Sequence, residues 1–372
     1  MLKLTVNRPY KLAEINKPHT TIKVLTPPVY PLENNYISCL WSSVRSYGVE
    51  VEQIELSSIV IQLKTNQRTG DVFHLHWIQS CYDLTPNRIP QSLWSTLKNL
   101  RHLFLLKSQG YQLVWTVHNT LSHNCSAPLI ERSFRWILSR LFSDIIVMSE
   151  YSRQEFAQMY GRTHRVHIVP HGNYIGAYPN QISRAEARQE LGIAPHQKVL
   201  LHLGKIKPYK GINQLLAVFR QIKDPDVVLI IAGLCREPEL LAEIKQATEA
   251  DSRIHLQLEF IKDEDIQIYM NACDWVVLPY EKILNSGGAL LALSFGRPVI
   301  VPCKGSLSEI ITDGKHGFCY PRDRDLGIAI NRALSTPAEH WQQMCTQSYA
   351  LAQKYNWSKI GRQIYKIYQQ GV

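Results

Sequence analysis

The segment HLGKIKPYKGI (202–212) combines residue types that could hold a phosphate group. A strand-like apolar run ends at Gly204, and Lys205 and Lys210 flank a loop that contains a proline. We expect a helix to start near Gly211. Two ammonium groups beside a helix start can neutralise a diphosphate. The alternative is that these lysines are ordinary solvated loop charges.

A second candidate for phosphate binding lies in DWVVLPYEKILNSGGALLALSFGRPVIVP (274–302), where an apolar strand passes to an apolar helix through Ser286, Gly287 and Gly288. The first N–H groups of a helix have no internal partner and carry partial positive charge. Glycine lets a ligand approach them, and serine can cap the helix. The alternative is a plain helix cap. A third, weaker candidate is a turn region, with a structural turn as its alternative: Gly305, Ser306, Glu309, Asp313 and Gly314.

Histidines lie at or near the predicted carboxyl ends of strands in the first half of the chain. His74 and His76 are two residues apart and should share one face of a strand. His118 ends the run WTVH, and His171 ends IVPH. Each could be a buried histidine satisfied by the backbone. Together they suggest groups that take a proton or hydrogen-bond a ligand hydroxyl.

The elements that must position these residues alternate between short β-branched runs and longer helical patterns. Alternation of this kind predicts parallel sheets flanked by helices. Two successive sets indicate two doubly wound, Rossmann-like α/β domains that face each other across a cleft, with ligands at the carboxyl ends of the strands. The predicted strands are 21–27, 71–77, 112–119, 144–150, 165–172, 198–204, 226–233, 254–260, 274–280 and 298–302.

Length and composition exclude several classes of protein. The 372 residues carry a formal net charge of +10, with 45% apolar and 19% charged residues. The first 180 residues hold 18 Lys and Arg against 11 Asp and Glu, a net of +7, and the remainder holds 23 against 20, a net of +3. No Gly-x-Gly-x-x-Gly follows the first strand of either half, which counts against a dehydrogenase. The eight cysteines form no Cys-x-x-Cys pair, so no zinc ribbon is expected.

The sequence also bears on location and partners. We find no signal peptide, no apolar run of membrane-spanning length and no recognised nucleic-acid module. We therefore expect a cytoplasmic protein that binds no nucleic acid. Two segments, 93–112 and 131–140, mix basic residues with aromatic and aliphatic ones, which suits a helix on anionic lipid at the inner face of the membrane. The alternative is an ordinary amphipathic helix packed on the sheet. The basic residues include Lys98, Arg101, Arg132, Arg135 and Arg140.

Residues 198–320 resemble the nucleotide-binding half of GT-B glycosyltransferases of the family-four type. The similarity rests on six segments in order: HLGKIKPYKGI, VVLIIAG, LEFIKDEDIQIYMNACDWVVLPY, the Ser-Gly-Gly helix, SFGRPVIVP and GSLSEIITDGKHGF. In the first half, PPVYPLENNYISCL, DVFHLHW, WTVHNTLSHN and IVPHGNYIGAYP resemble glycosyltransferases that extend lipid-linked exopolysaccharide precursors, such as the GDP-mannose:glycolipid β-1,4-mannosyltransferases. The C-terminal YNWSKIGRQIYKIYQ resembles the helix that crosses back to the first domain.

The resemblance implies domains at 1–177 for the acceptor and 178–352 for the nucleotide sugar, followed by a returning helix at 353–372. It implies a hexosyltransferase that uses a GDP- or UDP-sugar and a lipid-linked or other glycan acceptor. We expect no cofactor. We also expect no metal, because lysines and a helix end can replace it and we see no carboxylate cluster in the sequence that would demand one. Implied donor-diphosphate ligands are Lys205, Lys210, Ser286, Gly287 and Gly288, and implied nucleotide-binding residues are Gly204, Phe260 and Ile261. His118 and Glu33 are candidate catalytic residues, and candidate sugar or acceptor contacts are His74, His76, His171 and Glu281.

One departure from the family pattern concerns catalysis. The family typically has glutamates at the positions of Ile283 and Leu291, and Glu281 is two positions from the first of these. Their loss leaves the stereochemical outcome open and keeps two rivals in view. One rival is a sugar-nucleotide epimerase of the same fold. The other is an inactive sugar-nucleotide-binding subunit.

Overall fold

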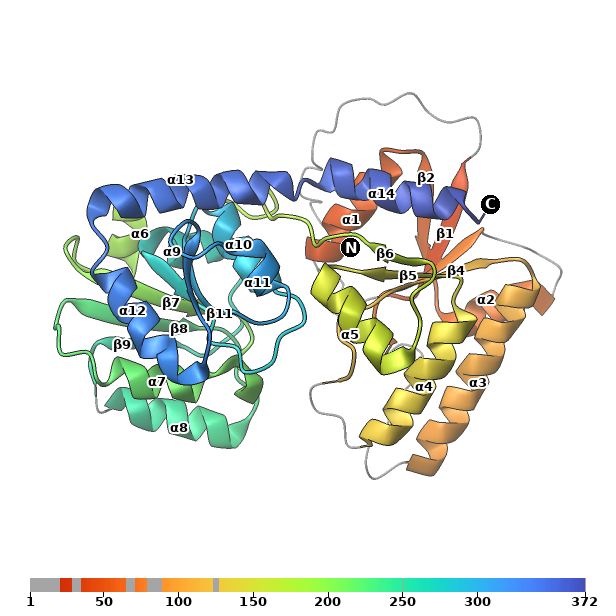
Figure 1. Ribbon diagram of the computed structural model, residues 1–372, viewed down its shortest axis with the longest axis horizontal. Helices are drawn as coiled ribbons and strands as arrows, with labels where there is room; N and C mark the ends of the chain where they lie inside the picture. The colour runs from red at the N-terminus through yellow and green to blue at the C-terminus, as the bar shows by residue number, and fades with distance from the viewer. Residues whose placement is uncertain are drawn as a thin grey trace, which may run out of the picture. The chain divides into compact units, whose positions relative to one another are not determined.

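The computed structural model describes residues 21–28, 35–64, 71–78, 89–122, 127–249 and 251–371. The chain divides into two compact units. The N-terminal unit comprises Met1–Gly172 together with Asn356–Val372, and the C-terminal unit comprises Asn173–Tyr355. Figure 1 labels most of the helices and many of the strands of both units.

The N-terminal unit is built on a parallel six-stranded sheet in the order β2-β1-β3-β4-β5-β6. Its strands are β1 (Ile22–Thr26), β2 (Val49–Gln53), β3 (Val72–Leu75), β4 (Gln112–Thr116), β5 (Asp144–Val147) and β6 (Val166–Ile168). Its helices are α1 (Asn35–Arg45), α2 (Leu56–Lys64), α3 (Ile89–Ser108), α4 (Pro128–Leu141), α5 (Glu150–Tyr160) and the C-terminal α14 (Trp357–Gln369).

The C-terminal unit repeats the plan with the order β12-β11-β10-β7-β8-β9, again all parallel. Its strands are β7 (Lys198–Leu203), β8 (Val227–Ala232), β9 (Ile254–Gln257), β10 (Trp275–Val277), β11 (Val299–Pro302) and β12 (Gly317–Tyr320). Its helices are α6 (Arg184–Glu190), α7 (Ile212–Phe219), α8 (Pro238–Glu249), α9 (Ile266–Ala272), α10 (Gly287–Ser294), α11 (Leu307–Ile310), α12 (Leu326–Leu334) and α13 (Ala338–Lys354), with 3₁₀ turns η3 (Pro208–Lys210) and η4 (Asp323–Asp325).

The central strands are buried on both faces, which explains their continuous apolar sequences. Every residue of β8, with sequence VVLIIA, is buried. Alternate side chains of β7 and β8 contribute to two separate apolar clusters, one on each face of the sheet. The doubly wound architecture expected from the sequence is therefore confirmed for each unit.

Each predicted strand coincides with an observed one, but two strands were missed. β2 has the sequence VEVEQ and β12 has GFCY, and both are at an edge of their sheet. An edge strand is short or exposes part of its length, so it lacks the apolar run on which the prediction relied. The predicted runs 254–260 and 274–280 were too long, since their last residues form the loops after β9 and β10.

Helix α14 packs against α1 within the N-terminal unit. A Cβ added to Gly361 of α14 would lie 2.0 Å from Ser43 Oγ, so the two helices approach too closely for a larger residue. The amide of Gln112 on β4 donates to the carbonyl of Ile367 at 2.9 Å. Across the described residues, no helix is both long enough and apolar enough to span a bilayer.

Candidate functional site

The loops singled out for phosphate binding follow β7, β10 and β11, which are adjacent in the sheet. Because all strands of this sheet are parallel, the loops emerge at one edge, where ligands of such sheets bind. The loop after β9, which carries Phe260 and Ile261, emerges at the same edge.

The three lysines of the first loop have different surroundings. Lys207 forms an ion pair with Glu237. Lys210 is partly buried, and its Nζ lies 4.0 Å from the centre of the Tyr280 ring. Lys205 is exposed and makes no hydrogen bond or ion pair with the residues that the structure describes. Lys205 and Lys210 are therefore available to an anion, whereas Lys207 is already neutralised.

This loop is held against the chain that follows β10. Gly211 has a φ of +72°, and a Cβ there would lie 1.9 Å from the carbonyl oxygen of Pro279, so only glycine fits. The backbone N–H of Glu281 donates to the carbonyl of Tyr209 at 3.0 Å. These contacts fix the position of Lys210 relative to Tyr280.

The start of α10 lies at the hydroxyl end of Tyr280. Ser286 caps this helix, its Oγ accepting from the N–H of Ala289 at 3.1 Å and lying 3.5 Å from the Tyr280 hydroxyl. A Cβ on Gly288 would lie 3.1 Å from the same hydroxyl. Tyr280 thus joins the two phosphate-binding candidates, Lys210 and the turn at Ser286–Gly288. Sequence reasoning missed Tyr280, although a tyrosine directly after a buried strand at the binding edge was a usable signal.

His202, another residue that the sequence did not single out, lies in β7 close to this loop. It is buried, and its Nδ1 lies 3.0 Å from the carbonyl of Val277. Burial, and then the charge of Lys210, lower the pKa of His202 to about 4. The imidazole is therefore neutral at pH 7 and adds no charge beneath the lysine.

The third candidate region begins with the loop after β11, which packs against the chain that follows β10. Its two parts, the loop at Gly305 and Ser306 and the turn at Asp313, have different surroundings. Gly305 has a φ of +57°, and a Cβ there would lie 2.3 Å from the Ile283 carbonyl. Ser306 is buried, and its Oγ has no hydrogen-bond partner in the described part of the chain. The turn at Asp313 is structural, because Asp313 pairs with Arg332 at 2.9 Å and accepts from the N–H of Cys319 at 2.9 Å.

The remaining donor-side candidates lie around this edge. Phe260 has 66% of its surface exposed, so its ring is open to a stacking partner, while Ile261 packs on the core. Glu281 is exposed. Ile283 and Leu291, at the positions where the resemblance implied glutamates, both pack on the apolar core. At both positions an apolar side chain that packs on the core therefore stands in place of the expected carboxylate.

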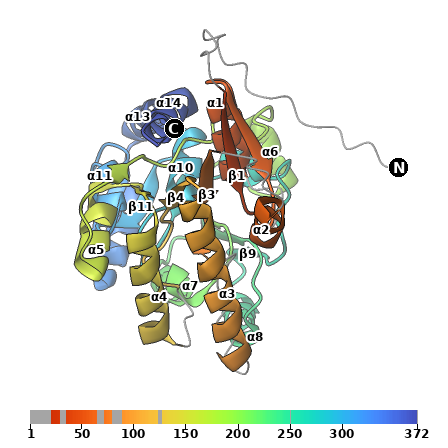
Figure 2. The same cartoon turned by 90° about the vertical axis from the view of Figure 1, so that its right-hand side faces the viewer.

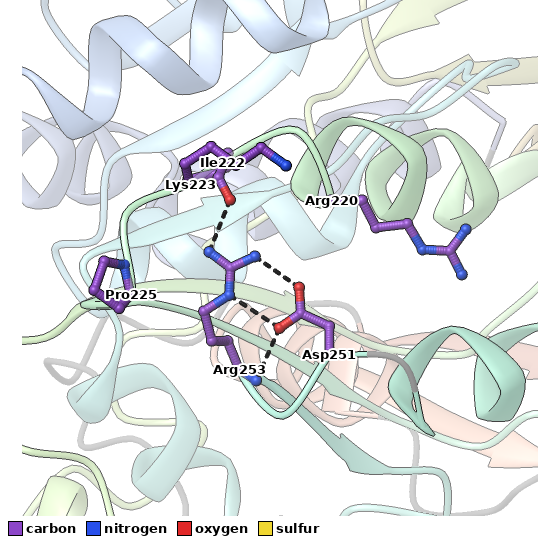
Figure 3. A pocket seen from close by; sticks show the side chains of 6 residues that line it. All are labelled: Arg220, Ile222, Lys223, Pro225, Asp251 and Arg253. Atoms are coloured by element: carbon purple, nitrogen blue, oxygen red, sulfur yellow. Dashed lines mark hydrogen bonds and ion pairs between the residues drawn. The ribbon is translucent and has the colours of Figure 1, made fainter.

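A pocket in the C-terminal unit lies elsewhere, at the amino ends of β8 and β9 (Figure 3). It has a volume of about 410 Å³. Its most prominent cation, Arg253, is already occupied by Asp251 at 2.6 Å and by the carbonyls of Ile222 and Asp224 at 2.8 and 2.9 Å. This arrangement braces the turn before β9 and leaves Arg253 no free charge for a ligand.

In the N-terminal unit the structure brings the four histidines into one aromatic cluster around Tyr36. The Tyr36 ring centre lies 6.0, 5.2 and 4.7 Å from those of His76, His118 and His171. His74 and His76 do share a face, with ring centres 4.3 Å apart.

His74 has a structural role in this cluster, contrary to the expectation of a sugar contact. It is fully buried, and both ring nitrogens are engaged, Nδ1 with the Tyr368 hydroxyl at 2.6 Å and Nε2 with Thr116 Oγ1 at 2.8 Å. Burial lowers the pKa of His74 to about 3. No nitrogen remains for a sugar hydroxyl, and the bond to Tyr368 ties α14 to the sheet.

His118 and His171 are the partly exposed members of the cluster. His118 stacks on Trp77 with ring centres 4.2 Å apart and an interplanar angle of 7°. His118 Nε2 lies 3.3 Å from Nδ1 of the buried His76, whose other nitrogen has no partner among the described residues. Burial, reinforced by neighbouring imidazoles, holds the pKa of His118 well below its usual range.

His171 donates from Nδ1 to the adjacent Gly172 carbonyl at 2.7 Å, and burial lowers its pKa to about 4. A neutral imidazole can accept a proton or a hydrogen bond from a hydroxyl group. Glu33, the other candidate base, lies outside the described residues.

Comparison with known proteins identifies the family. The model for "Glycosyl transferases group 1" matches residues 183–350. The chain is 30% identical over 311 residues to GDP-mannose:glycolipid 4-beta-D-mannosyltransferase of Xanthomonas campestris, covering 80% of this chain and 79% of that relative. The chain is a group 1 glycosyltransferase.

Two further comparisons concern the family and the fold. Lipopolysaccharide 1,2-N-acetylglucosaminetransferase of Salmonella typhimurium is 28% identical over 53% of this chain and 54% of its own. The structure of Anabaena HepE in complex with UDP superposes with a TM-score of 0.72 at 21% identity, covering 93% of this chain and 99% of that one. The glycosyltransferase therefore has the GT-B fold, as the sequence predicted.

Proposed function

We propose that this glycosyltransferase moves a hexose from a nucleoside-diphosphate sugar to a glycan acceptor carried on a lipid, in polysaccharide assembly. GDP-mannose is the first donor to test and a UDP-sugar the second. Support for these two donors comes from the Xanthomonas relative, whose name includes GDP-mannose, and from HepE, whose structure contains UDP. The Salmonella relative, named for lipopolysaccharide, again favours an acceptor attached to lipid.

The observation that carries the proposal is the meeting of Lys210 and the α10 N-terminus at Tyr280, with Lys205 unpaired nearby. When the sugar leaves, negative charge grows on the diphosphate. Two ammonium groups and the N–H groups at Ser286–Gly288 would stabilise that charge, so the catalytic effect is mainly electrostatic. We propose that these groups act without a metal ion.

The acceptor hydroxyl loses a proton in this reaction, and we assign that proton to His118 or Glu33. His118 has a neutral imidazole and is partly exposed, as a base requires. Its lowered pKa makes it a weak base, so its contribution rests on orientation of the hydroxyl as much as on proton transfer. His76, 3.3 Å away, would fix the tautomer of His118.

The absence of acidic side chains at Ile283 and Leu291 keeps one rival, a subunit that binds sugar nucleotide without turning it over. A panel of GDP- and UDP-sugars, incubated with and without a glycolipid acceptor, separates the cases. The proposal predicts nucleotide release together with a glycolipid heavier by one hexose, and only when acceptor is present. Binding without release would establish the inactive subunit, and a changed donor sugar without acceptor would establish an epimerase.

A glycolipid acceptor also places the reaction at a membrane surface. We accordingly propose a cytoplasmic, peripheral enzyme that meets the inner face of the membrane. The partners are then the nucleotide sugar, the glycolipid and an anionic lipid surface.

A further inference from the structure

Helices α3 and α4 of the N-terminal unit each carry two apolar stripes. The inner stripe of α3 includes Leu100, Leu103 and Leu106, which are buried in the core of the unit. A second stripe faces solvent, with Trp94 69% exposed, Leu97 64% and Phe104 54%. Spacings of three, seven and ten residues place these three on one side of the helix. Packing on the sheet therefore accounts for the inner stripe and not for the outer one.

Helix α4 lies beside α3 (Figures 1 and 2) and repeats this arrangement. Phe134 and Leu138 are buried in the same core, while Leu129 is 79% exposed and Trp136 49%. The outer surfaces of two neighbouring helices thus present large apolar side chains together. Elsewhere in the described chain such residues are scattered singly, as Ile328 on α12 is, and single exposures need no partner.

The charge on this surface has one sign. Exposed basic residues lie between the apolar ones: Lys98 and Arg101 on α3, and Arg132 and Arg140 on α4. Lys98 Nζ lies 6.0 Å from the Trp94 ring centre, and the Arg140 guanidinium lies 5.2 Å from that of Trp136.

Acidic charge is absent from the outer faces of both helices. Within Ile89–Ser108 and Pro128–Leu141 the single acidic residue is Glu131, which is buried and paired with Arg135 at 2.6 Å. The expectation that Arg135 faces lipid is therefore wrong, because that side chain is buried in the pair.

We propose that the outer faces of α3 and α4 dock the protein on an anionic lipid bilayer. A bilayer surface offers negative headgroups for the basic side chains and an apolar layer for the tryptophans, which favour the interface between water and lipid. A second copy of this chain fits poorly, since two such faces would bring like charges together. The inference deepens the proposed function by naming the surface that would reach a lipid-linked acceptor.

The test is co-sedimentation with vesicles of phosphatidylcholine, with and without phosphatidylglycerol, in the absence of donor and acceptor. We expect binding that needs phosphatidylglycerol and falls with added salt. The Trp94→Ser/Trp136→Ser double variant should bind at least tenfold more weakly. At about fivefold per surface charge, Lys98→Gln/Arg140→Gln should lose about 25-fold. The matched control, Ile328→Ser/Tyr349→Ser, changes exposed apolar residues of the C-terminal unit and should bind as the wild type does.

A second readout locates the contact. Brominated lipids should quench tryptophan fluorescence of the bound protein, and Trp94→Phe/Trp136→Phe should keep binding while losing most of the quenching. Equal binding of all variants, or no dependence on phosphatidylglycerol, would overturn the proposal. The proposal would also be overturned if light scattering showed that the wild type is a dimer and that the Trp94→Ser/Trp136→Ser variant is a monomer. Turnover of a short water-soluble acceptor should be unchanged in these variants, so failure of docking is distinguishable from failure of the transferase assignment.

Discussion

Replacement of Lys210 by glutamine tests the donor site directly. The substitution removes a positive charge and keeps most of the side-chain length. At about 4 Å and an effective dielectric constant of about 20, one charge on the diphosphate interacts with this ammonium by ~4 kcal/mol before desolvation is counted. A hydrogen bond to a charged group typically contributes about 2 kcal/mol net. We therefore expect kcat/KM for the nucleotide sugar to fall about 30-fold.

The chain supplies its own matched control for this experiment. Lys207 lies in the same loop, but its charge is already paired with Glu237. A partly exposed pair of this kind contributes about 0–1 kcal/mol to stability. Lys207→Gln should therefore leave kcat/KM within about twofold, while Lys205→Gln should reduce it. Lys210→Arg, which keeps the charge above the Tyr280 ring, should recover part of the loss.

The assay is release of nucleoside diphosphate with saturating acceptor, with thermal unfolding recorded for each variant. If Lys210→Gln and Lys207→Gln lower kcat/KM equally, the loop acts through its general charge and the specific contact is refuted. If Lys210→Gln turns over donor normally while its unfolding temperature matches the wild type, the anion does not sit beside Tyr280 at all.

Three further predictions follow from the same geometry. Ser286→Ala removes the cap of α10, so the free energy of unfolding of the C-terminal unit, measured by chemical denaturation, should fall by about 1 kcal/mol. The KM for the donor should also rise. An unchanged KM would show that the capping residue does not contribute to donor binding. His118→Gln should lower kcat at least tenfold with little change in donor KM, and because the pKa of His118 is far below 6.5, wild-type kcat should stay flat from pH 8 to 6; a step near 6.5 would contradict this. His74 has a pKa lowered to about 3, so the unfolded chain binds its proton first as pH falls below about 6.5, and stability should drop by about 1.4 kcal/mol per pH unit for this residue. Urea unfolding at pH 7 and pH 5 measures that slope, which should be shallower in His74→Gln.

The sheets were predictable from sequence because the central strands are buried on both faces. A run such as VVLIIA in β8 has no polar residue, so its state is encoded locally. The edge strands β2 and β12 were not predictable in the same way. VEVEQ alternates apolar and acidic residues and is exposed on one face, and its strand character depends on pairing with β1, which is a long-range contact.

The histidines show what the spacing of residues in the sequence can and cannot predict. A separation of two residues correctly predicts that His74 and His76 share a face. It cannot predict that Tyr368, distant in the sequence, engages one nitrogen of His74 and so gives that residue a structural role. The partner that decides the function of each imidazole comes from another element.

The lysines lead to the same conclusion from the donor side. The sequence does not distinguish the three lysines of this loop, Lys205, Lys207 and Lys210. For each of them, a phosphate ligand and an ordinary solvated charge were equally open interpretations. The structure separates them by neighbours that are distant in sequence, since Glu237 neutralises one and Tyr280 supports another. A pocket for an anion needs cations that the protein itself has not neutralised. Whether a lysine is left without an acidic partner depends on the folded structure and not on the local sequence. The replacement of a single lysine by glutamine is therefore the more direct test of this anion site.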